Sequence, residues 1–181
     1  MLCLITKINY YTHFGSNKSV KEVTTSMHQS DLGPHFKTLN EAWLKKYFVI
    51  EPIDTYVLSH PDEITKQGGE IIYALIDKQV IGCAALKHQG NQVFELTKMA
   101  VTESHQAQGI GAVIMQRCIE MYHSLNGKKL YLETHSSLKP AIKLYARFGF
   151  IEKSHPFISE YQRSDYYMEY QGSNNMNPEQ T

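Results

Sequence analysis

The sequence is poor in cysteine, and its cysteines are far apart. Its 181 residues include only Cys3, Cys83 and Cys118, an odd number with no Cys-x-x-Cys pair. A disulfide scaffold and a cysteine zinc site both require paired, regularly spaced cysteines. We therefore expect no disulfide framework and no metal site, and we expect the reducing environment of the cytoplasm.

Long hydrophobic runs and an excess of one charge are also missing. No apolar run approaches the roughly 18 residues of a membrane span, and the start Met1–Ile5 lacks the basic and apolar segments of a signal peptide. Lysine and arginine number 18, as do aspartate and glutamate. Because polyanion binders normally carry a basic excess, we expect neither a membrane nor a nucleic-acid partner.

What is present is the composition of one globular domain. Hydrophobic residues make up 42% and charged residues 20% of the chain, which are ordinary values. We expect one domain over residues 20–171, since this length fits a single core. Residues 1–19 are an extension or a first strand, and the polar residues 172–181 are predicted to be a disordered tail.

The spacing of apolar residues predicts an α/β fold with a mixed, mostly antiparallel sheet and helices on its faces. Apolar residues from Phe36 to Tyr47 recur at helical spacing, and Pro61 begins a further helix. Two more helices are expected from Ile110 to Tyr122 and from Pro140. Strands are expected over residues 20–27, 71–76, 80–86, 93–101, 130–134, 150–153 and 165–170, with a possible earlier strand over 5–12.

A glycine-containing segment, Gln106-Ala-Gln-Gly-Ile-Gly111, joins the 93–101 strand to the following helix. Two glycines at a helix start allow backbone N–H groups to converge on an anion, and the helix dipole favours a pyrophosphate there. A simple strand-to-helix turn would also suit this hexapeptide. A dinucleotide fingerprint is excluded because Ile114 stands where its third glycine would be, and no Gly-Lys-Ser/Thr of a P-loop is present.

Three segments in order resemble the GNAT superfamily of acyl-CoA-dependent N-acyltransferases. They are Glu95-Leu-Thr-Lys-Met-Ala-Val101, the Gln106–Gly111 loop and Ala141-Ile-Lys-Leu-Tyr-Ala-Arg-Phe-Gly-Phe150. The resemblance extends over roughly residues 20–170, including Ala42–Phe48. It implies a V-shaped opening between the 93–101 strand and the 130–134 strand, with acetyl-CoA as cosubstrate and an amine as acceptor.

The resemblance also implies which residues hold the cofactor. Backbone groups near Met99, Ala100 and Val101 would hold the pantetheine arm. The pyrophosphate would lie on the loop formed by Gln106, Ala107, Gln108, Gly109, Ile110, Gly111 and Ala112. Many family members carry asparagine just before the late helix, whereas this chain has Ser136-Ser137-Leu138 there, so Ser137 is the candidate contact from that loop.

The chemistry requires a base and an acid. A lysine-like amine is neutral only about 0.04% of the time at pH 7, so a general base speeds its attack. Glu95 is the candidate, 14 residues before Gly109, as in some family members. Simple alternation places it on one strand face with Met99 and Val101, and its alternative is a strand glutamate in an ion pair. The resemblance implies that Tyr145 is the acid, with a core tyrosine as the alternative, and that a backbone N–H near Met99 stabilises the oxyanion.

The acceptor site is expected to involve the first long helix. Trp43, Tyr47 and Phe48 are candidate pocket residues, and a plain core stripe is the alternative. Other candidates have simpler explanations: His135 as a loop residue and Lys98 as one half of an ion pair. Glu51 and Asp54 could attract an amine or form a solvated acidic turn.

The sequence therefore predicts an N-acetyltransferase that uses direct attack, because no cysteine lies in its motifs to form an acyl-enzyme. A non-catalytic acyl-CoA-binding or sensing module on the same fold is the alternative hypothesis. A different nucleotide-binding enzyme is the third hypothesis. The acceptor stays open among small amines, amino acids, peptide N-termini, lysines and aminoglycosides. By analogy with relatives, a homodimer is one expected assembly.

Overall fold

The computed structural model describes residues 7–8 and 22–172 of the chain. The predicted N-terminal extension, apart from Lys7–Ile8, and the predicted tail from residue 173 onward lie outside the described residues. Of the strand expected over residues 20–27, Val23–Met27 is observed.

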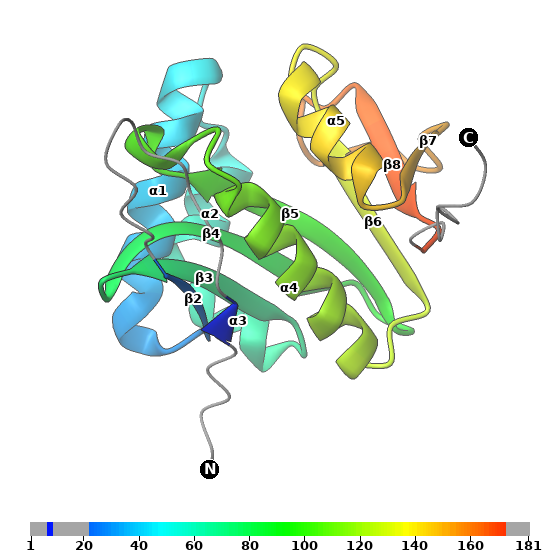
Figure 1. Cartoon of the computed structure of the whole chain (residues 1–181). Helices are drawn as coiled ribbons and strands as arrows, with labels where there is room; N and C mark the ends of the chain where they lie inside the picture. The colour runs from blue at the N-terminus through cyan, green and yellow to red at the C-terminus, as the bar shows by residue number, and fades with distance from the viewer. Residues whose placement is uncertain (1–6, 9–21, 173–181) are drawn as a thin grey trace, which may run out of the picture.

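A single mixed sheet forms the centre of the molecule, with the strand order β1-β2-β3-β4-β5-β6-β8-β7 (Figure 1). Only β5 and β6 run parallel, and every other neighbouring pair in the described sheet is antiparallel. The predicted mixed, mostly antiparallel sheet is confirmed. The strands are β1 (Lys7–Ile8), β2 (Val23–Met27), β3 (Glu70–Ile76), β4 (Gln79–His88), β5 (Val93–Val101), β6 (Lys129–Thr134), β7 (Phe150–Lys153) and β8 (Tyr166–Tyr170).

Helices cover both faces of this sheet. The helix α4 crosses one face and α5 lies beside it, while α1, α2 and α3 cover the opposite face (Figure 1). Short 3₁₀ turns precede α1 and follow β5. The helices are α1 (Gly33–Tyr47), α2 (Pro52–Ser59), α3 (Pro61–Lys66), α4 (Ile110–Ser124) and α5 (Lys139–Arg147).

Side-chain alternation along the strands builds one core on each face. Ile72 and Leu86 pack with Ile114 of α4, whereas Ile71 and Tyr73 pack with α1 and its neighbours. Because successive strand residues point to opposite faces, a continuous apolar run such as 71–76 supplies both cores.

The sequence pattern missed helix α2. No helix was expected between Tyr47 and Pro61, but Pro52 begins one. Glu51 and Asp54 form a capping box, in which each carboxylate accepts a hydrogen bond from the other residue's backbone N–H. Proline suits the first helical position because its missing N–H needs no partner there. The solvated acidic turn considered for these two residues is thus wrong.

Within the described residues, no helix is both long enough and apolar enough to cross a bilayer.

Candidate active site

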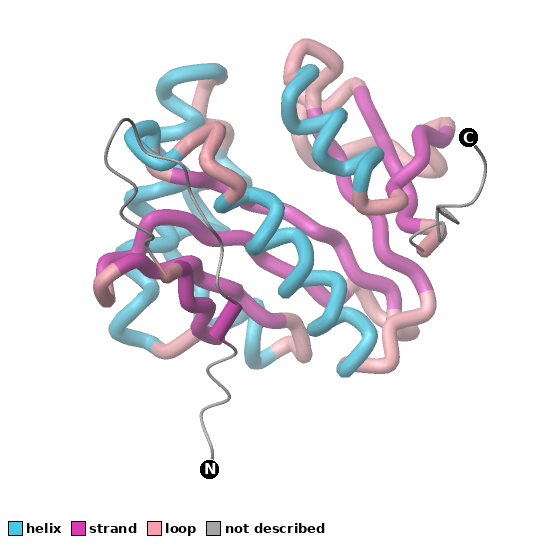
Figure 2. The backbone as a smooth tube through the Cα atoms, in the orientation of Figure 1, coloured by secondary structure: helices cyan, strands magenta, loops and turns pink. Residues whose placement is uncertain are grey.

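The opening in the sheet lies where the two parallel strands separate. β5 and β6 pair with each other from Val93–Lys129 to Glu95–Tyr131. Beyond the Glu95–Tyr131 pair the two strands no longer pair with each other. The two strands visibly diverge along the rest of their length (Figure 2). Their separated ends, Leu96–Met99 and Glu133–Thr134, line one pocket.

A β-bulge in β5 changes which side chains face each side of the sheet. Thr97 pairs with Ala85 and Ala100 pairs with Cys83, so two β5 residues lie opposite one residue of β4. Lys98, in this bulge, has a positive φ of 53°. An extra residue of this kind bends the strand and shifts the alternation by one position.

The bulge overturns one prediction about Glu95. Met99 and Val101 pack against the core beneath α4, whereas Ala100 packs on the other face. Glu95 pairs with Lys87 of β4, and two residues further along β5 Thr97 pairs with Ala85. Residues two apart in a strand share a face, and Ala85 packs on the face that carries α1, so Glu95 lies on that face. Glu95 therefore does not share a face with Met99 and Val101, because simple alternation fails at the bulge.

The loop before α4 presents a row of free backbone donors. The N–H groups of residues 107–111 have no acceptor among the described residues, while the Ala112 N–H already donates to Gly109 O at 2.9 Å. Ala107 and Gly109 adopt positive φ values of 59° and 83°. Consecutive N–H groups at the start of a helix form an anion-binding concavity. The geometry supports the predicted phosphate loop, with residue 112 excluded as a donor.

Two glutamines hold this loop in place through their side chains. Gln106 Nε2 donates to the Val101 carbonyl at 3.0 Å, and Gln108 Nε2 donates to the Ser104 carbonyl at 2.8 Å. Gln106 also uses its backbone N–H, which donates to Glu103 O. Their side chains thus brace the loop, each through one N–H of its amide group.

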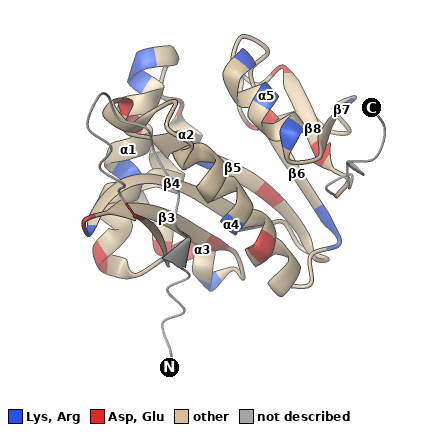
Figure 3. Cartoon of the chain, in the orientation of Figure 1, with Lys and Arg blue, Asp and Glu red and all other residues tan. Residues whose placement is uncertain are grey.

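Helix α5 supplies positive charge opposite the loop. Its residues Lys143 and Arg147 line a groove of about 470 Å³ together with the loop residues Ala107, Gly109, Gly111 and Ala112. Both cations are exposed, and Figure 3 shows the Lys and Arg positions along α5. Sequence reasoning missed them because helical period alone does not say which surface an exposed lysine faces. Among the described residues, no group of metal ligands is present.

The pocket at the strand ends shares no lining residue with this groove, and aromatic, apolar and polar groups all line it. Trp43 and Phe48 line it, whereas Tyr47 does not. Tyr47 is 42% exposed and contacts the Trp43 ring from outside. The lining residues are Asn40, Trp43, Leu44, Phe48, Leu96, Thr97, Lys98, Met99, Glu133, Thr134, His135, Leu138, Tyr145, Tyr161, Arg163 and Ser164.

Glu133 is the carboxylate of this lining. Its side chain is 7% exposed, and its Oε2 atom is buried without a hydrogen-bond partner among the described residues. The nearest cation candidate is His155, whose Nε2 lies 4.0 Å from Oε2. A buried carboxylate oxygen without a donor is costly, so it favours any ligand that brings an N–H group. Sequence reasoning missed Glu133, although a lone charged residue in an apolar strand that ends at the opening was a usable signal.

Glu95 is close to the same region but is not in the pocket lining. It is buried, and its Oε2 accepts a hydrogen bond from Gln89 Nε2 at 2.8 Å. Burial raises the pKa of the Glu95 carboxyl, and the charge of Glu133 adds to this effect, while Lys87 and Lys98 oppose it. A raised pKa keeps a proton on Glu95 more readily than on a solvated glutamate.

Tyr145 of α5 lines the pocket and comes from the same helix as Lys143 and Arg147, which line the groove. Its hydroxyl makes no hydrogen bond with the described residues, and its ring packs near Phe150 at 6.3 Å between centroids. Burial raises the pKa of Tyr145 to about 12, so its hydroxyl stays protonated at neutral pH. Tyr145 is thus able to donate a proton into the pocket.

The loop after β6 is ordered by its own serines. Ser137 donates its N–H to His135 Nδ1 at 3.1 Å, and its Oγ lies 2.7 Å from the same atom. Ser136 donates both its N–H and its hydroxyl to Asp165 at 2.6 Å. His135 lines the pocket and contacts the Phe48 ring, whereas Ser137 is outside the lining. The loop histidine is therefore the member of this pair that reaches the pocket.

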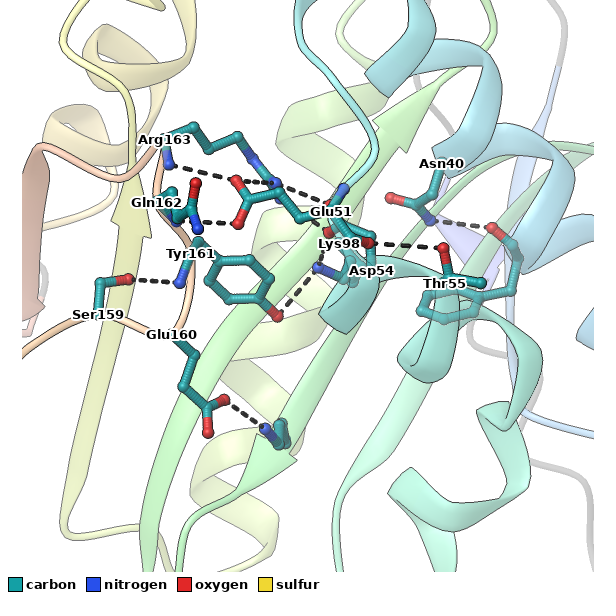
Figure 4. Close-up of polar contacts among 12 residues, drawn as sticks. Asn40, Glu51, Asp54, Thr55, Lys98, Ser159, Glu160, Tyr161, Gln162 and Arg163 are labelled. Atoms are coloured by element: carbon teal, nitrogen blue, oxygen red, sulfur yellow. Dashed lines mark hydrogen bonds and ion pairs between the residues drawn. The ribbon is translucent and has the colours of Figure 1, made fainter.

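A buried ion-pair network closes the pocket on its far side (Figure 4). Lys98 Nζ donates to Asp54 Oδ1 at 2.8 Å and to the Tyr161 hydroxyl at 3.0 Å. Arg163 donates to both oxygens of Asp54 at 2.7 and 2.8 Å and to Glu51 at 2.9 Å. The network joins α2, the bulge in β5 and the segment between β7 and β8.

The Asp54 carboxyl is ionised in this network, because the cations beside it lower its pKa by more than burial raises it. Burial alone would raise the pKa of the Asp54 carboxyl, but the hydrogen bonds from Arg163 and the charge of Lys98 hold it below its ordinary value. Lys98 forms the expected ion pair, and it also lines the pocket.

Comparisons with known proteins agree with this geometry. A profile of the acetyltransferase (GNAT) family matches residues 36–150. The uncharacterized N-acetyltransferase YsnE of Bacillus subtilis is 36% identical over 74 residues, covering 40% of this chain and 49% of that protein. An N-alpha-acetyltransferase of Sulfurisphaera tokodaii is 28% identical over 109 residues, covering 59% and 64%. The chain thus spans about half to two thirds of the length of these relatives.

Solved structures share the fold at low sequence identity. A GNAT-family acetyltransferase of Staphylococcus aureus is 17% identical, with a TM-score of 0.75 over 82% of this chain and 98% of that chain. The structure of yncA from Salmonella typhimurium, solved with acetyl-CoA, is 16% identical, with a TM-score of 0.66 over 88% and 99%. At these identities the likeness concerns the fold, and it confirms the predicted architecture.

Proposed function

This chain belongs to the acetyltransferase (GNAT) family, and on that basis we propose that it transfers the acetyl group of acetyl-CoA to a primary amine by direct attack. The observation that carries the proposal is the row of free N–H groups over residues 107–111, opposite Lys143 and Arg147. The yncA structure with acetyl-CoA and the N-alpha-acetyltransferase relative support the cosubstrate and the reaction class.

Acetyl-CoA would be held by three groups of residues. The N–H groups of residues 107–111 and the cations Lys143 and Arg147 would bind its phosphates. The backbone of β5 at residues 99–101 would hold the pantetheine arm. When bound, the cosubstrate supplies an activated thioester, and the chain supplies orientation, a base and an acid.

The base is proposed to be Glu133. It lines the pocket and has an oxygen free to accept a proton, directly or through water. Glu95 remains the alternative base suggested by the sequence. Its place outside the lining and its hydrogen bond from Gln89 make Glu133 the better positioned of the two.

The oxyanion and the leaving thiolate need donors. The backbone N–H of Met99, in the β5 bulge, is proposed to donate to the oxyanion. Tyr145 is proposed to donate its proton to the departing thiolate of CoA. Both residues line the pocket, on the side nearest the groove that Lys143 and Arg147 line.

Tyr145→Phe is expected to lower kcat by about 10²-fold while the Kd for acetyl-CoA stays within about twofold. The change removes only a hydroxyl that has no hydrogen-bond partner among the described residues, so the fold should be kept. The buried Tyr122 of α4 lies outside the lining, and Tyr122→Phe serves as the matched control with unchanged kcat. Steady-state rates of thiol release check this, and equal rates for the Tyr145 and Tyr122 variants would remove the acid role.

Binding of acetyl-CoA is expected to raise the melting temperature by about 5–10 °C at 100 times its Kd, which corresponds to about 2.7 kcal/mol. Gly109 and Gly90 form a matched pair for this test, because both have positive φ (83° and 87°) and neither has an atom within 4 Å of an added Cβ. Each change to alanine should cost about 1 kcal/mol of stability through backbone strain. Only Gly109→Ala should reduce the shift, since Gly90 lies in a distant hairpin.

ATP and NAD serve as ligand controls in the same melting experiment. A shift with acetyl-CoA alone, reduced in Gly109→Ala and kept in Gly90→Ala, is the expected pattern. Equal shifts with ATP or NAD would favour another nucleotide-binding enzyme. No shift in a folded sample would show that the loop is only a turn.

The second candidate function is a non-catalytic acyl-CoA-binding module. It would retain the phosphate loop and leave Glu133 and Tyr145 without a chemical role. Glu133 argues against it, because a protein that only binds acetyl-CoA gains nothing from a buried, unpartnered carboxylate in the adjoining pocket.

A further inference from the structure

We infer that the acceptor is a primary amine with no carboxylate next to its amino group, so that free amino acids are poor substrates. This inference rests on the proposed function and deepens it. It follows from which charges in the pocket are already paired and which is not.

The cations in the pocket lining have no capacity left for a substrate carboxylate. Lys98 and Arg163 both contact Asp54 at 2.7–2.8 Å, and Arg163 also contacts Glu51 at 2.9 Å. The Asp54 side chain is 0% exposed and that of Lys98 is 4% exposed. Each positive charge thus has a buried carboxylate partner, and the four charges sum to zero.

His135 does not add a free cation. Its Nδ1 accepts the Ser137 N–H at 3.1 Å. Its Nε2 faces the Asp165 carboxylate at 3.8 Å. Asp165 is therefore the carboxylate that this ring already faces, and a substrate carboxylate would compete with it.

Glu133 is the charged group of this wall without a hydrogen-bonded counterion. Its Oε2 is buried without a hydrogen-bond partner among the described residues, and His155 Nε2 lies 4.0 Å from it. An ammonium group in the pocket would give this carboxylate a counterion. A carboxylate on the adjacent carbon would instead meet the negative charge of Glu133 without a compensating donor.

The rest of the lining suits the neutral body of an amine. The rings of Trp43 and Phe48 lie 5.6 Å apart between centroids, and the Tyr161 ring faces the same pocket. Aromatic faces attract cations and bury apolar stems. Small alkyl or arylalkyl amines, lysine side chains and peptide N-termini share this chemistry, since each carries an ammonium flanked by uncharged groups.

Matched triplets of acceptors test the inference through the rate of thiol release from acetyl-CoA. Phenylalanine, phenylalanine amide and 2-phenylethylamine form one triplet, and leucine, leucine amide and isoamylamine form another. A lysine peptide blocked at its N-terminus and an unblocked lysine-free peptide separate the two peptide sources. We expect kcat/KM for the amine or the amide to exceed that for the amino acid by 100-fold or more.

An amino acid that reacts as fast as its amide or amine would overturn the inference. So would the absence of turnover with every amine, amide and peptide in a sample that acetyl-CoA stabilises against unfolding. A sample that acetyl-CoA does not stabilise would instead overturn the proposed function. The melting measurement on the same preparation therefore tells the two failures apart.

Discussion

Replacing Glu133 by glutamine is expected to lower kcat by about 10²–10⁴-fold, because the amine then has no base to take its proton. Glutamine has nearly the same shape, so the Kd for acetyl-CoA should change by less than about threefold. The variant should also fold, since Glu133 Oε2 has no hydrogen bond to lose among the described residues. Thiol release at saturating amine, together with acetyl-CoA titration, measures both quantities.

Glu95→Gln is the matched control for this prediction, since it neutralises the other carboxyl of the pair. Gln89 can still donate to a glutamine oxygen at this position, and we expect kcat to fall less than in Glu133→Gln. A larger loss of kcat in Glu95→Gln than in Glu133→Gln would return the base role to Glu95.

Asp54→Asn is expected to destabilise the folded protein by about 3–5 kcal/mol at pH 7, the usual effect of removing one partner of a buried ion pair. Lys98 and Arg163 both lose their shared carboxylate in this variant, and Lys98 is left buried with only neutral partners, the asparagine amide oxygen and the Tyr161 hydroxyl. Urea unfolding at constant temperature measures the change. The exposed pair Lys46–Glu103 is the control, and Glu103→Gln should cost no more than about 1 kcal/mol.

The effect of Asp54 should also depend on pH in a defined direction. Its pKa in the folded protein lies below its ordinary value of 3.8, so the ionised carboxylate stabilises the folded state above about pH 4. This contribution is lost as the pH falls through the lower folded value. The stability gap between the natural protein and Asp54→Asn should therefore be constant from pH 5 to 8 and shrink below pH 4. A gap that widens in acid would contradict the charged network.

The fold could be predicted where one signal dominated the local structure. Strict helical spacing gave α1 and α4, and the apolar runs around Asp77-Lys78 gave the β3–β4 hairpin. The loop before α4 was predictable as a strand-to-helix connection because the sequence places two glycines directly between a strand and a helix. Helix α2 was missed because Pro52 was interpreted as the end of the preceding helix, whereas α1 ends at Tyr47 and Pro52 stands at the start of α2.

The site was less predictable because it depends on irregular backbone and on distant segments. The bulge at Lys98 moves each later residue of β5 to the face opposite the one that simple alternation predicts. No residue type in this strand predicts the bulge. Tyr161 and Arg163 reach the pocket from the irregular segment between β7 and β8, where no period applies. Trp43 and Phe48 were found because they belong to a regular helix and its end, while Tyr47 of the same stripe points away.

Acetyl transfer from acetyl-CoA to an amine is tested most directly by measuring CoA and acetylated amine together in one reaction. Purified protein would be incubated with acetyl-CoA and a mixture of small amines, amino acids, amino acid amides and short peptides. The products would be analysed by mass spectrometry. We expect N-acetylated amine and free CoA in equal amounts, with Glu133→Gln nearly inactive. Tight binding of acetyl-CoA without amine-dependent release of CoA would contradict this expectation and identify a binding module.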